Sequence, residues 1–469
     1  MTALKVTQHA FVAVAKRWCA GQIGMALLAV GALVAMWMLV TSSGRMVYVV
    51  GGVAALGVLL LVIKYPMLGA CFGAFAISSS IGEFVPHSVS VALLITGAAL
   101  VVRKLLTRDF SWRVTPVAKW GILLVTWWTF SILWGNYYDY FSFENVYRVV
   151  LVVLIFSEVV RTPKQYVAVV MATGVGIAFT AFTTVHAMIE FFHTGTYGAI
   201  ANLSSQTGAA RFAGHWADFN YMALATVPFV GLVFSIFRSR TYAYLRVPAG
   251  IFLVCGIASI LLSLSRAGIL CLIIMFAIII AAEKRKWLWL LGLSLVVGAL
   301  LMVLPIDLGG RLETLFKPRG DASLQQRTQL ALAGLRAFSE HGLLGIGMSN
   351  FLVSSSDYIW NLGNESLVHN SFLEVGVESG VLGVVLLCGA LCATLLRTKP
   401  RPFRIDSHNL GQTLLVCQSA AVVSVIFGMM TLSAANFVPL WLVFALSGIT
   451  RTVFEQPSDG SIMPVTCRA

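Results

Sequence analysis

The sequence predicts an all-α, polytopic membrane protein with about 12–14 transmembrane helices and one large helical periplasmic loop. Hydrophobic residues make up 58% of the 469 positions and charged residues only 11%, and the mean hydropathy is +0.88, far from the values of a soluble domain. Apolar runs of about 17 to 25 residues recur along the whole chain, which is the length that a helix needs to cross a bilayer. Strands of an outer-membrane barrel are much shorter.

We expect about fourteen spans, which together make residues 1–469 a single transmembrane domain. Their approximate positions are 22–41, 46–63, 66–82, 88–102, 117–135, 144–160, 166–191, 215–236, 248–264, 267–282, 287–305, 370–396, 411–433 and 437–451. The first run follows Lys16 and Arg17, as in a signal peptide, but it is long for one and has no convincing A-x-A site. We therefore interpret it as a spanning helix.

Positive charge predicts the orientation, because cytoplasmic connections carry an excess of Lys and Arg. With both termini in the cytoplasm, most of the 32 Lys and Arg residues fall on the cytoplasmic side. The net charge of +13 is then a topology signal and an attraction to membrane lipids, and it does not indicate nucleic acid. Arg211, Arg266 and Arg327 are exceptions, because they lie on the outer side. The orientation of the chain does not explain them, so we expect them to have a functional role. The eight cysteines show no metal-binding spacing, and we expect no metal and no cofactor.

The outer segment 306–368 is too long for a simple connection, and we expect it to cover an active site. Leu324, Ala331, Leu335 and Phe338 form an apolar stripe with helical spacing. At about 100° per residue, Arg327 lies at the edge of this stripe and Arg336 lies on the opposite side of the helix. The pattern therefore predicts that Arg327 faces the membrane domain and that Arg336 is solvated.

These residue types suit the transfer of a group from a diphosphate. A guanidinium group stays charged and binds phosphate oxygens in a bidentate manner, although lipid anchoring or pairing with a carboxylate is an alternative role. His369, which closes the loop, is a candidate general base for a sugar hydroxyl, and a purely structural histidine at a helix start is the alternative. Asp218 and Asn220 either cap the next helix or hold the arginines, and Asn370 is a further supporting candidate.

Five ordered segments carry a resemblance to a known family. They are RFAGHWADFNYMALAxxP (Arg211–Pro228), SLSRAG (Ser263–Gly268), SxxxR (Ser323–Arg327), GIGMSNF (Gly345–Phe351) and HNSFLExGxxSGxxG (His369–Gly383). Together they resemble the O-antigen ligase and polymerase superfamily over about residues 200–390. Phe219 stands where a proline is common and Ala331 where tryptophan is frequent, which loosens the assignment to a branch.

The resemblance implies a metal-independent, inverting glycosyltransferase at the periplasmic face of a bacterial inner membrane. Its donor would be a glycan on undecaprenyl diphosphate. By analogy, Arg211, Arg266 and Arg327 would bind the diphosphate and His369 would activate the acceptor hydroxyl. The acceptor glycolipid would be lipid A–core for a ligase and a lipid-linked repeat unit for a polymerase, and nothing in the sequence separates the two.

Two other classes of function are alternatives. A transporter or flippase for lipid-linked sugars usually needs ionisable groups near the middle of the membrane, and the predicted spans hold few of them. A non-catalytic scaffold accounts for the spans but gives no reason for the outer arginines.

Overall fold

The computed structural model describes residues 57–79, 81–85, 87–137, 140–194, 201–203, 210–214, 216, 218–304, 322–358 and 367–455. Among these residues the structure is almost wholly helical, apart from β1 (Ala201–Leu203) and β2 (Ala210–Phe212), which pair antiparallel. The all-α class is therefore confirmed. The predicted span 22–41 and the loop residues 306–321 and 359–366 lie outside the described residues.

The described residues fall into two compact units, with boundaries after Gly69, Leu93 and Phe110. The second unit, Ala70–Leu93 and Ser111 onwards, contains every candidate site residue. The helices are α3 (Pro66–Ser78), α4 (Ile81–Phe84), α5 (Ser88–Thr107), α6 (Pro116–Ser131), α7 (Tyr140–Val159), α8 (Pro163–Thr194), α9 (Phe219–Arg238), α10 (Arg246–Leu262), α11 (Arg266–Ala281), α12 (Lys286–Val303), α14 (Ala322–His341), α15 (Asn350–Tyr358), α16 (Ser371–Thr398), α17 (Leu410–Met429) and α18 (Val438–Phe454).

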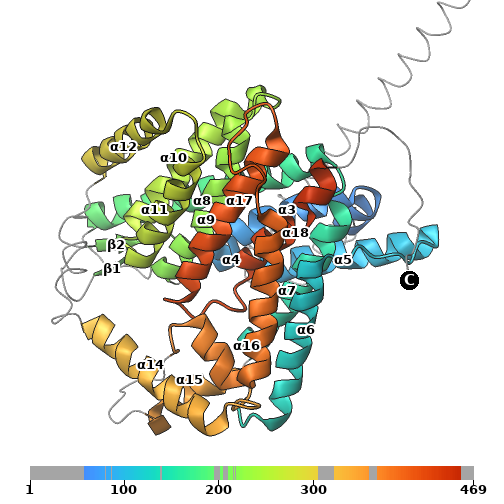
Figure 1. The fold of residues 1–469 in the computed structure, drawn as a ribbon, viewed down its shortest axis with the longest axis vertical. Coiled ribbons are helices and arrows are strands. Elements are labelled where there is room, and N and C mark those ends of the chain that lie inside the picture. The colour runs from blue at the N-terminus through green and yellow to red at the C-terminus, as the bar shows by residue number, and fades with distance from the viewer. Residues whose placement is uncertain are drawn as a thin grey trace, which may run out of the picture. The chain divides into compact units, whose positions relative to one another are not determined.

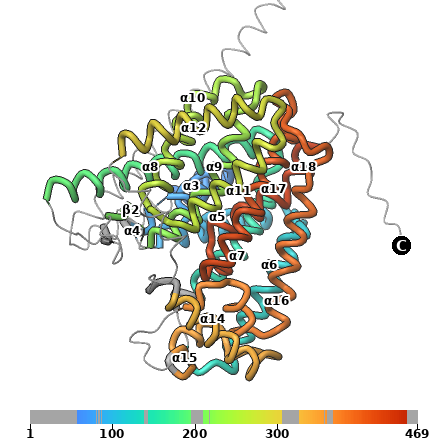
Figure 2. The backbone as a smooth tube through the Cα atoms, turned by 60° about the vertical axis from the view of Figure 1, so that its left-hand side comes forward, coloured from blue at the N-terminus to red at the C-terminus, as the bar shows by residue number. Residues whose placement is uncertain are grey.

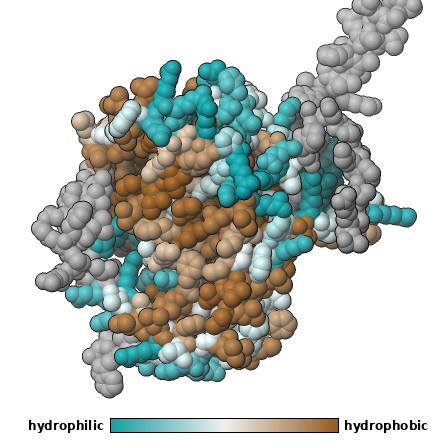
Figure 3. Space-filling view, viewed as in Figure 1, coloured by the Kyte–Doolittle hydropathy of each residue, from teal (hydrophilic) through white to brown (hydrophobic). Residues whose placement is uncertain are grey.

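Eight helices in the described part of the chain are long and apolar enough to cross a membrane. They are α5, α6 with its 3-10 extension to Trp134, α8, α9, α10 with the preceding turn, α12, α16 and α17, while α11 and α18 are shorter apolar helices. On the face shown in Figure 3, hydrophobic residues cover the middle of the helices and hydrophilic residues gather towards their ends. The protein is thus a polytopic membrane protein.

The first two helices that the structure describes meet at a sharp bend. Gly57–Lys64 and Pro66–Ser78 are bent by 113° relative to each other, as in a broken span or a re-entrant loop, and residues 46–56 of the predicted span 46–63 lie outside the described residues. The break coincides with Pro66, whose ring and missing N–H prevent a helix from continuing through it.

Helix α9 forms the centre of the second unit, since every residue from Met222 to Ile236 is buried. It packs against α8, α10, α11 and α17, whereas α16 packs along α6 and α18 along α7. Helices α9, α11, α16 and α18 all begin at one end of this bundle, and α6, α8 and α17 finish there. Figures 1 and 2 show α14 and α15 gathered at this same end, beside the lower ends of α6 and α16.

The buried face of α14 is not the predicted stripe. Leu330, Ala333 and Ala337 are buried in a cluster with residues of α15 and α16, whereas Leu335 of the stripe is 54% exposed. By helical geometry the true face is rotated about 120° from the predicted one. Small residues account for the difference, because they let α14 approach α16 closely: a Cβ on Gly334 would lie 3.1 Å from Leu373 Cδ2.

Candidate functional site

Arg211 lies in β2 and its side chain is buried, with 7% of the residue exposed. Its Nε donates to the Ser263 carbonyl at 3.0 Å and its NH2 group to Asn220 Oδ1 at 3.3 Å. The guanidinium also stacks on the Phe219 ring, with 3.1 Å between Cζ and the ring centroid. These contacts hold a buried cation at the start of α9 and fix its orientation.

Arg266 is the first residue of α11, and the Ser265 hydroxyl caps that helix by accepting from Gly268 N. The same hydroxyl donates to Asn220 Oδ1 at 2.8 Å, so Asn220 ties Arg211 to the start of α11. Leu264, just before the cap, has a φ of 46°, a region that non-glycine residues rarely occupy. A guanidinium at a helix N-terminus, where free N–H groups point outward, creates a favourable place for an anion.

Arg327 lies on α14 at the edge of its buried face, one turn before Leu330, and it is half-buried. Its NH1 group donates to the Thr431 carbonyl, just after α17, at 3.2 Å. Arg336 is exposed, as predicted. Arg327 borders both the predicted stripe and the true buried face, and therefore its inward position was predicted correctly although the stripe was wrong.

His369 lies two residues before α16, with a φ of 56°. Its backbone N–H donates to Ser433 Oγ at 3.1 Å, and its Nδ1 atom is buried without a hydrogen-bond partner among the described residues. Burial and the positive charge of Arg327 lower the pKa of His369 to about 4, against a smaller opposing effect of Asp218. The imidazole is therefore neutral at pH 7 and able to accept a proton.

Tyr221 and Ser433 connect the two parts of the candidate site, and sequence reasoning missed both. The Tyr221 hydroxyl donates to the Ser433 carbonyl at 2.6 Å, while the Ser433 hydroxyl accepts from His369. Tyr221 follows Asn220 directly in the first turn of α9. The structure thus connects Arg211 through Asn220 and Ser265 to the start of α11, where Arg266 lies. It also brings Arg327 and His369 together near Ser433.

Two of the supporting candidates act as helix caps. Asp218 Oδ1 accepts from the backbone of Asn220 at 2.6 Å and of Tyr221 at 3.0 Å. Asn370 Oδ1 accepts from Phe372 N and Leu373 N, at 3.0 Å and 3.1 Å. Each side chain satisfies N–H groups that a helix start leaves free, so both residues position the side chains that flank them.

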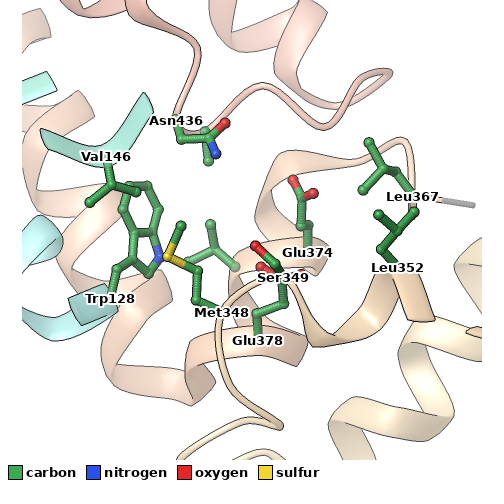
Figure 4. A pocket seen from close by; sticks show the side chains of 11 residues that line it. Trp128, Val146, Met348, Ser349, Leu352, Leu367, Glu374, Glu378 and Asn436 are labelled. Carbon is green, nitrogen blue, oxygen red and sulfur yellow. The ribbon is translucent and has the colours of Figure 1, made fainter. Parts of the chain in front are cut away.

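A cavity along the first turns of α16 is the second feature that sequence reasoning missed. It measures about 50 Å³, which is room for a few water molecules. Figure 4 shows Glu374, Glu378 and Ser349 in the middle of its lining, with Trp128 and Met348 on one side and Leu352 and Leu367 on the other. His369 and the three arginines are not among its lining residues. The two glutamates lie at i and i+4 on α16, a spacing that puts both on one face.

The loop that carries the GIGMSNF motif is docked on α16 by backbone hydrogen bonds. Ile346 N donates to the Val377 carbonyl and Gly347 N to the Glu378 carbonyl, each at 2.9 Å. Gly345 and Gly347 have φ values of 76° and 96°, and a Cβ at Gly345 would lie 2.4 Å from the Glu378 carbonyl carbon. Glycine is therefore required where this loop crosses the glutamates of the cavity.

Asn350 closes the far side of this loop. Its Oδ1 atom accepts from Asn136 N and Tyr137 N, both at 2.9 Å, and its Nδ2 atom donates to the Tyr137 carbonyl at 3.2 Å. The turn after α6 is thereby fixed to the start of α15. The last residue of the motif, Phe351, is fully buried against α14, so the motif is largely a structural support for the cavity.

Residues 251–388 match the family model described as O-antigen ligase. The matched region includes Arg266, Arg327 and His369, whereas Arg211 precedes it. A comparison with curated proteins finds no match.

Proposed function

Because residues 251–388 match the family model described as O-antigen ligase, we propose that this chain transfers a glycan from undecaprenyl diphosphate to a sugar hydroxyl. The reaction takes place at the periplasmic side of a bacterial inner membrane and serves surface polysaccharide synthesis. The acceptor is either lipid A–core or a second lipid-linked repeat unit. The family match supports ligase- or polymerase-type chemistry. The roles of the individual residues in it are part of our proposal.

The proposed reaction is a single displacement. The acceptor oxygen attacks the anomeric carbon of the donor sugar, the bond from that carbon to the diphosphate oxygen breaks, and the configuration inverts. His369 takes the proton of the acceptor hydroxyl. The leaving diphosphate keeps the electron pair of the broken bond, and guanidinium groups stabilise the charge that develops on it.

The observation that carries this proposal is the imidazole of His369, whose buried Nδ1 atom has no hydrogen-bond partner among the described residues and which lies near the cationic Arg327. Burial and that arginine keep the pKa of His369 near 4, so the base is unprotonated at pH 7. An arriving diphosphate would offset the charge of Arg327 and would therefore raise the pKa of His369. In that case the histidine becomes a stronger base when the donor is bound.

The left-handed backbone at His369 supports the same role. A φ of 56° at a non-glycine residue costs free energy of order 1–3 kcal/mol and persists only where the surroundings impose it. Here Ser433 holds the backbone N–H of His369, and the Asn370 cap holds the next residues in the helix. The backbone that carries the imidazole is thus fixed before any substrate arrives, which favours a positioned general base.

A transfer assay tests the proposal. Purified protein in detergent receives lipid-linked glycan and an acceptor glycolipid, and formation of the new glycosidic bond is measured. We expect His369→Ala to lower the rate about 10²- to 10⁴-fold and Arg266→Ala to lower it strongly as well. His341→Ala and Arg336→Ala replace exposed residues of the same types on α14 and should retain activity. Wild-type rates in His369→Ala and Arg266→Ala would exclude the mechanism.

Glycan profiles of a deletion strain separate the two acceptors. Loss of polymer on a lipid A–core that still bears one repeat indicates a polymerase, whereas long polymer without a lipid A–core indicates a ligase. Movement of donor across vesicles without any new glycosidic bond would instead indicate the transporter alternative.

A further inference from the structure

A second, strongly basic cavity lies at the other end of the bundle from His369. It measures about 1120 Å³ and is lined by residues from the end of α9, the start of α10, the α11–α12 turn with α12, and the α16–α17 connection. Asp218 and Arg238 bracket α9, whose 20 residues separate this cavity from the first site by about 30 Å. The cavity is therefore a different place in the molecule.

The lining carries a large excess of positive charge. Arg238 and Glu283 form an ion pair, with NH2 to Oε2 at 3.1 Å, and so offset each other. The remaining basic residues of the lining are Arg240, Arg246, Lys284, Arg285, Arg401 and Arg404, against Asp406 as the only other acidic one. Within the described chain, the side chains of Lys284, Arg285, Arg401 and Arg404 make no hydrogen bond or ion pair. They are exposed to the cavity or to solvent.

The wall that carries Arg401 and Arg404 is attached to the helices. Arg240 N donates to the Ser407 carbonyl at 2.8 Å, and Ile405 N donates to the Ala282 carbonyl at 3.1 Å. The connection between α16 and α17 is thereby held across the ends of α9 and α11. Topology alone requires basic residues on this side, but it does not require them to converge on one cavity from four parts of the chain.

The remaining wall is apolar and belongs to α12. Leu288 and Trp289 line the cavity, none of the residues of α12 is buried, and the neighbouring Trp287 is 81% exposed. In a membrane protein such a helix faces acyl chains, so the cavity is open both to phosphate groups and to lipid. On the face seen in Figure 3, hydrophilic residues gather at this end of the helices, next to the hydrophobic surface.

We propose that this cavity binds the phosphate headgroup of an anionic phospholipid, whose acyl chains run along α12. Guanidinium and ammonium groups bind phosphate oxygens with charge-assisted hydrogen bonds, and basic pockets between spanning helices are suited to anionic headgroups. A zwitterionic lipid carries no net charge and gains little from this excess of cations. The inference goes beyond the proposed transfer reaction and does not depend on it.

The test compares variants of the purified full chain in neutral detergent, with lipid binding measured by native mass spectrometry and by the rise in melting temperature. Phosphatidylglycerol, phosphatidylcholine and free pyrophosphate are added separately. The cavity variant is Arg401→Gln/Arg404→Gln. Its matched control, Lys119→Gln/Lys164→Gln, removes two exposed charges at the same end of the bundle but outside the cavity.

Wild-type protein should bind phosphatidylglycerol in preference to phosphatidylcholine. Each basic residue near an anionic headgroup contributes a factor of about five in affinity, so the cavity variant should bind roughly 30-fold more weakly and the control should match wild type. A second variant, Lys284→Gln/Arg285→Gln, changes the facing wall and should show the same loss of binding. Agreement between the two variants excludes misfolding of either one as the cause of the loss.

Three results would overturn the proposal. An equal loss in the Lys119→Gln/Lys164→Gln control would mean that diffuse surface charge binds the lipid. Equal binding of the two lipids would remove the role of headgroup charge. Binding of pyrophosphate as tight as that of phosphatidylglycerol would identify a site for free anions and would exclude the lipid.

Discussion

The lowered pKa of His369 makes a quantitative prediction about its reactivity in acid. An imidazole whose pKa is about 4 is about 97% neutral at pH 5.5, whereas one with the ordinary pKa of 6.5 is about 9% neutral at that pH. Because diethyl pyrocarbonate modifies only the neutral ring, the modification rate of His369 at pH 5.5 should be nearly the same as at pH 8. An ordinary histidine would slow about tenfold.

The assay is peptide-resolved mass spectrometry of the modified protein, which distinguishes His369 from the other seven histidines. The quantity compared is the modification rate at pH 5.5 divided by the rate at pH 8. Limited access to the half-buried ring affects both rates equally and cancels in this ratio. Arg327→Gln removes a positive charge that disfavours the imidazolium ion, so the pKa should rise and the ratio should fall. Asp218→Asn removes a negative charge that favours it, so the pKa should fall further.

Arg336→Gln is the matched control, because this arginine lies on the exposed side of the same helix. The reasoning is refuted if wild-type His369 slows tenfold at pH 5.5, or if Arg336→Gln shifts the ratio as much as Arg327→Gln.

The same pKa predicts how stability depends on pH. The folded state holds His369 neutral, so the unfolded state binds more protons between pH 6.5 and about 4. The free energy of unfolding is therefore not reduced by His369 above pH 6.5. It falls as the pH drops from 6.5 towards 4, by up to roughly 3 kcal/mol for a shift of this size. Comparison of unfolding midpoints of wild type and His369→Gln at pH 7.5 and pH 5 checks the sign, because wild type should lose more on acidification.

Three further substitutions have expected outcomes. Gly345→Ala should lower the melting temperature, because it forces a left-handed residue against the α16 backbone at a cost above about 1 kcal/mol. The control Gly298→Ala should be neutral or stabilising, because nothing lies within 4 Å of the added Cβ. Asn350→Ala leaves backbone groups of the turn after α6 unsatisfied. The free energy of unfolding should therefore fall by about 1–3 kcal/mol or more in thermal or denaturant unfolding. A change below about 0.5 kcal/mol would contradict the assigned contacts. Arg211→Lys keeps the charge but loses the forked contacts to Ser263 and Asn220, so transfer should fall in rate assays even at equal expression, and full activity would show that charge alone suffices.

Several features of this protein followed from the sequence alone. Membrane class and helical content depend on apolar runs, and a run that is long enough to span a bilayer must form a helix because its backbone groups find no water there. The inward position of Arg327 and the place of His369 beside a helix start are local consequences of chain position and helical geometry. The ordered motifs were sufficient to indicate the superfamily, and the match of residues 251–388 confirms that resemblance.

The buried face of α14 and the surroundings of His369 depended on the tertiary structure. Large apolar residues dominated the predicted stripe, yet Ala333 and Ala337 are buried because the neighbouring helix comes close enough to exclude larger side chains. Ser433 meets His369 across 64 residues of chain, and Tyr221 meets Ser433 across 212. Contacts of this kind leave no periodic trace in a sequence. Which groups surround the histidine, and therefore its pKa, is decided only by the packing of distant helices.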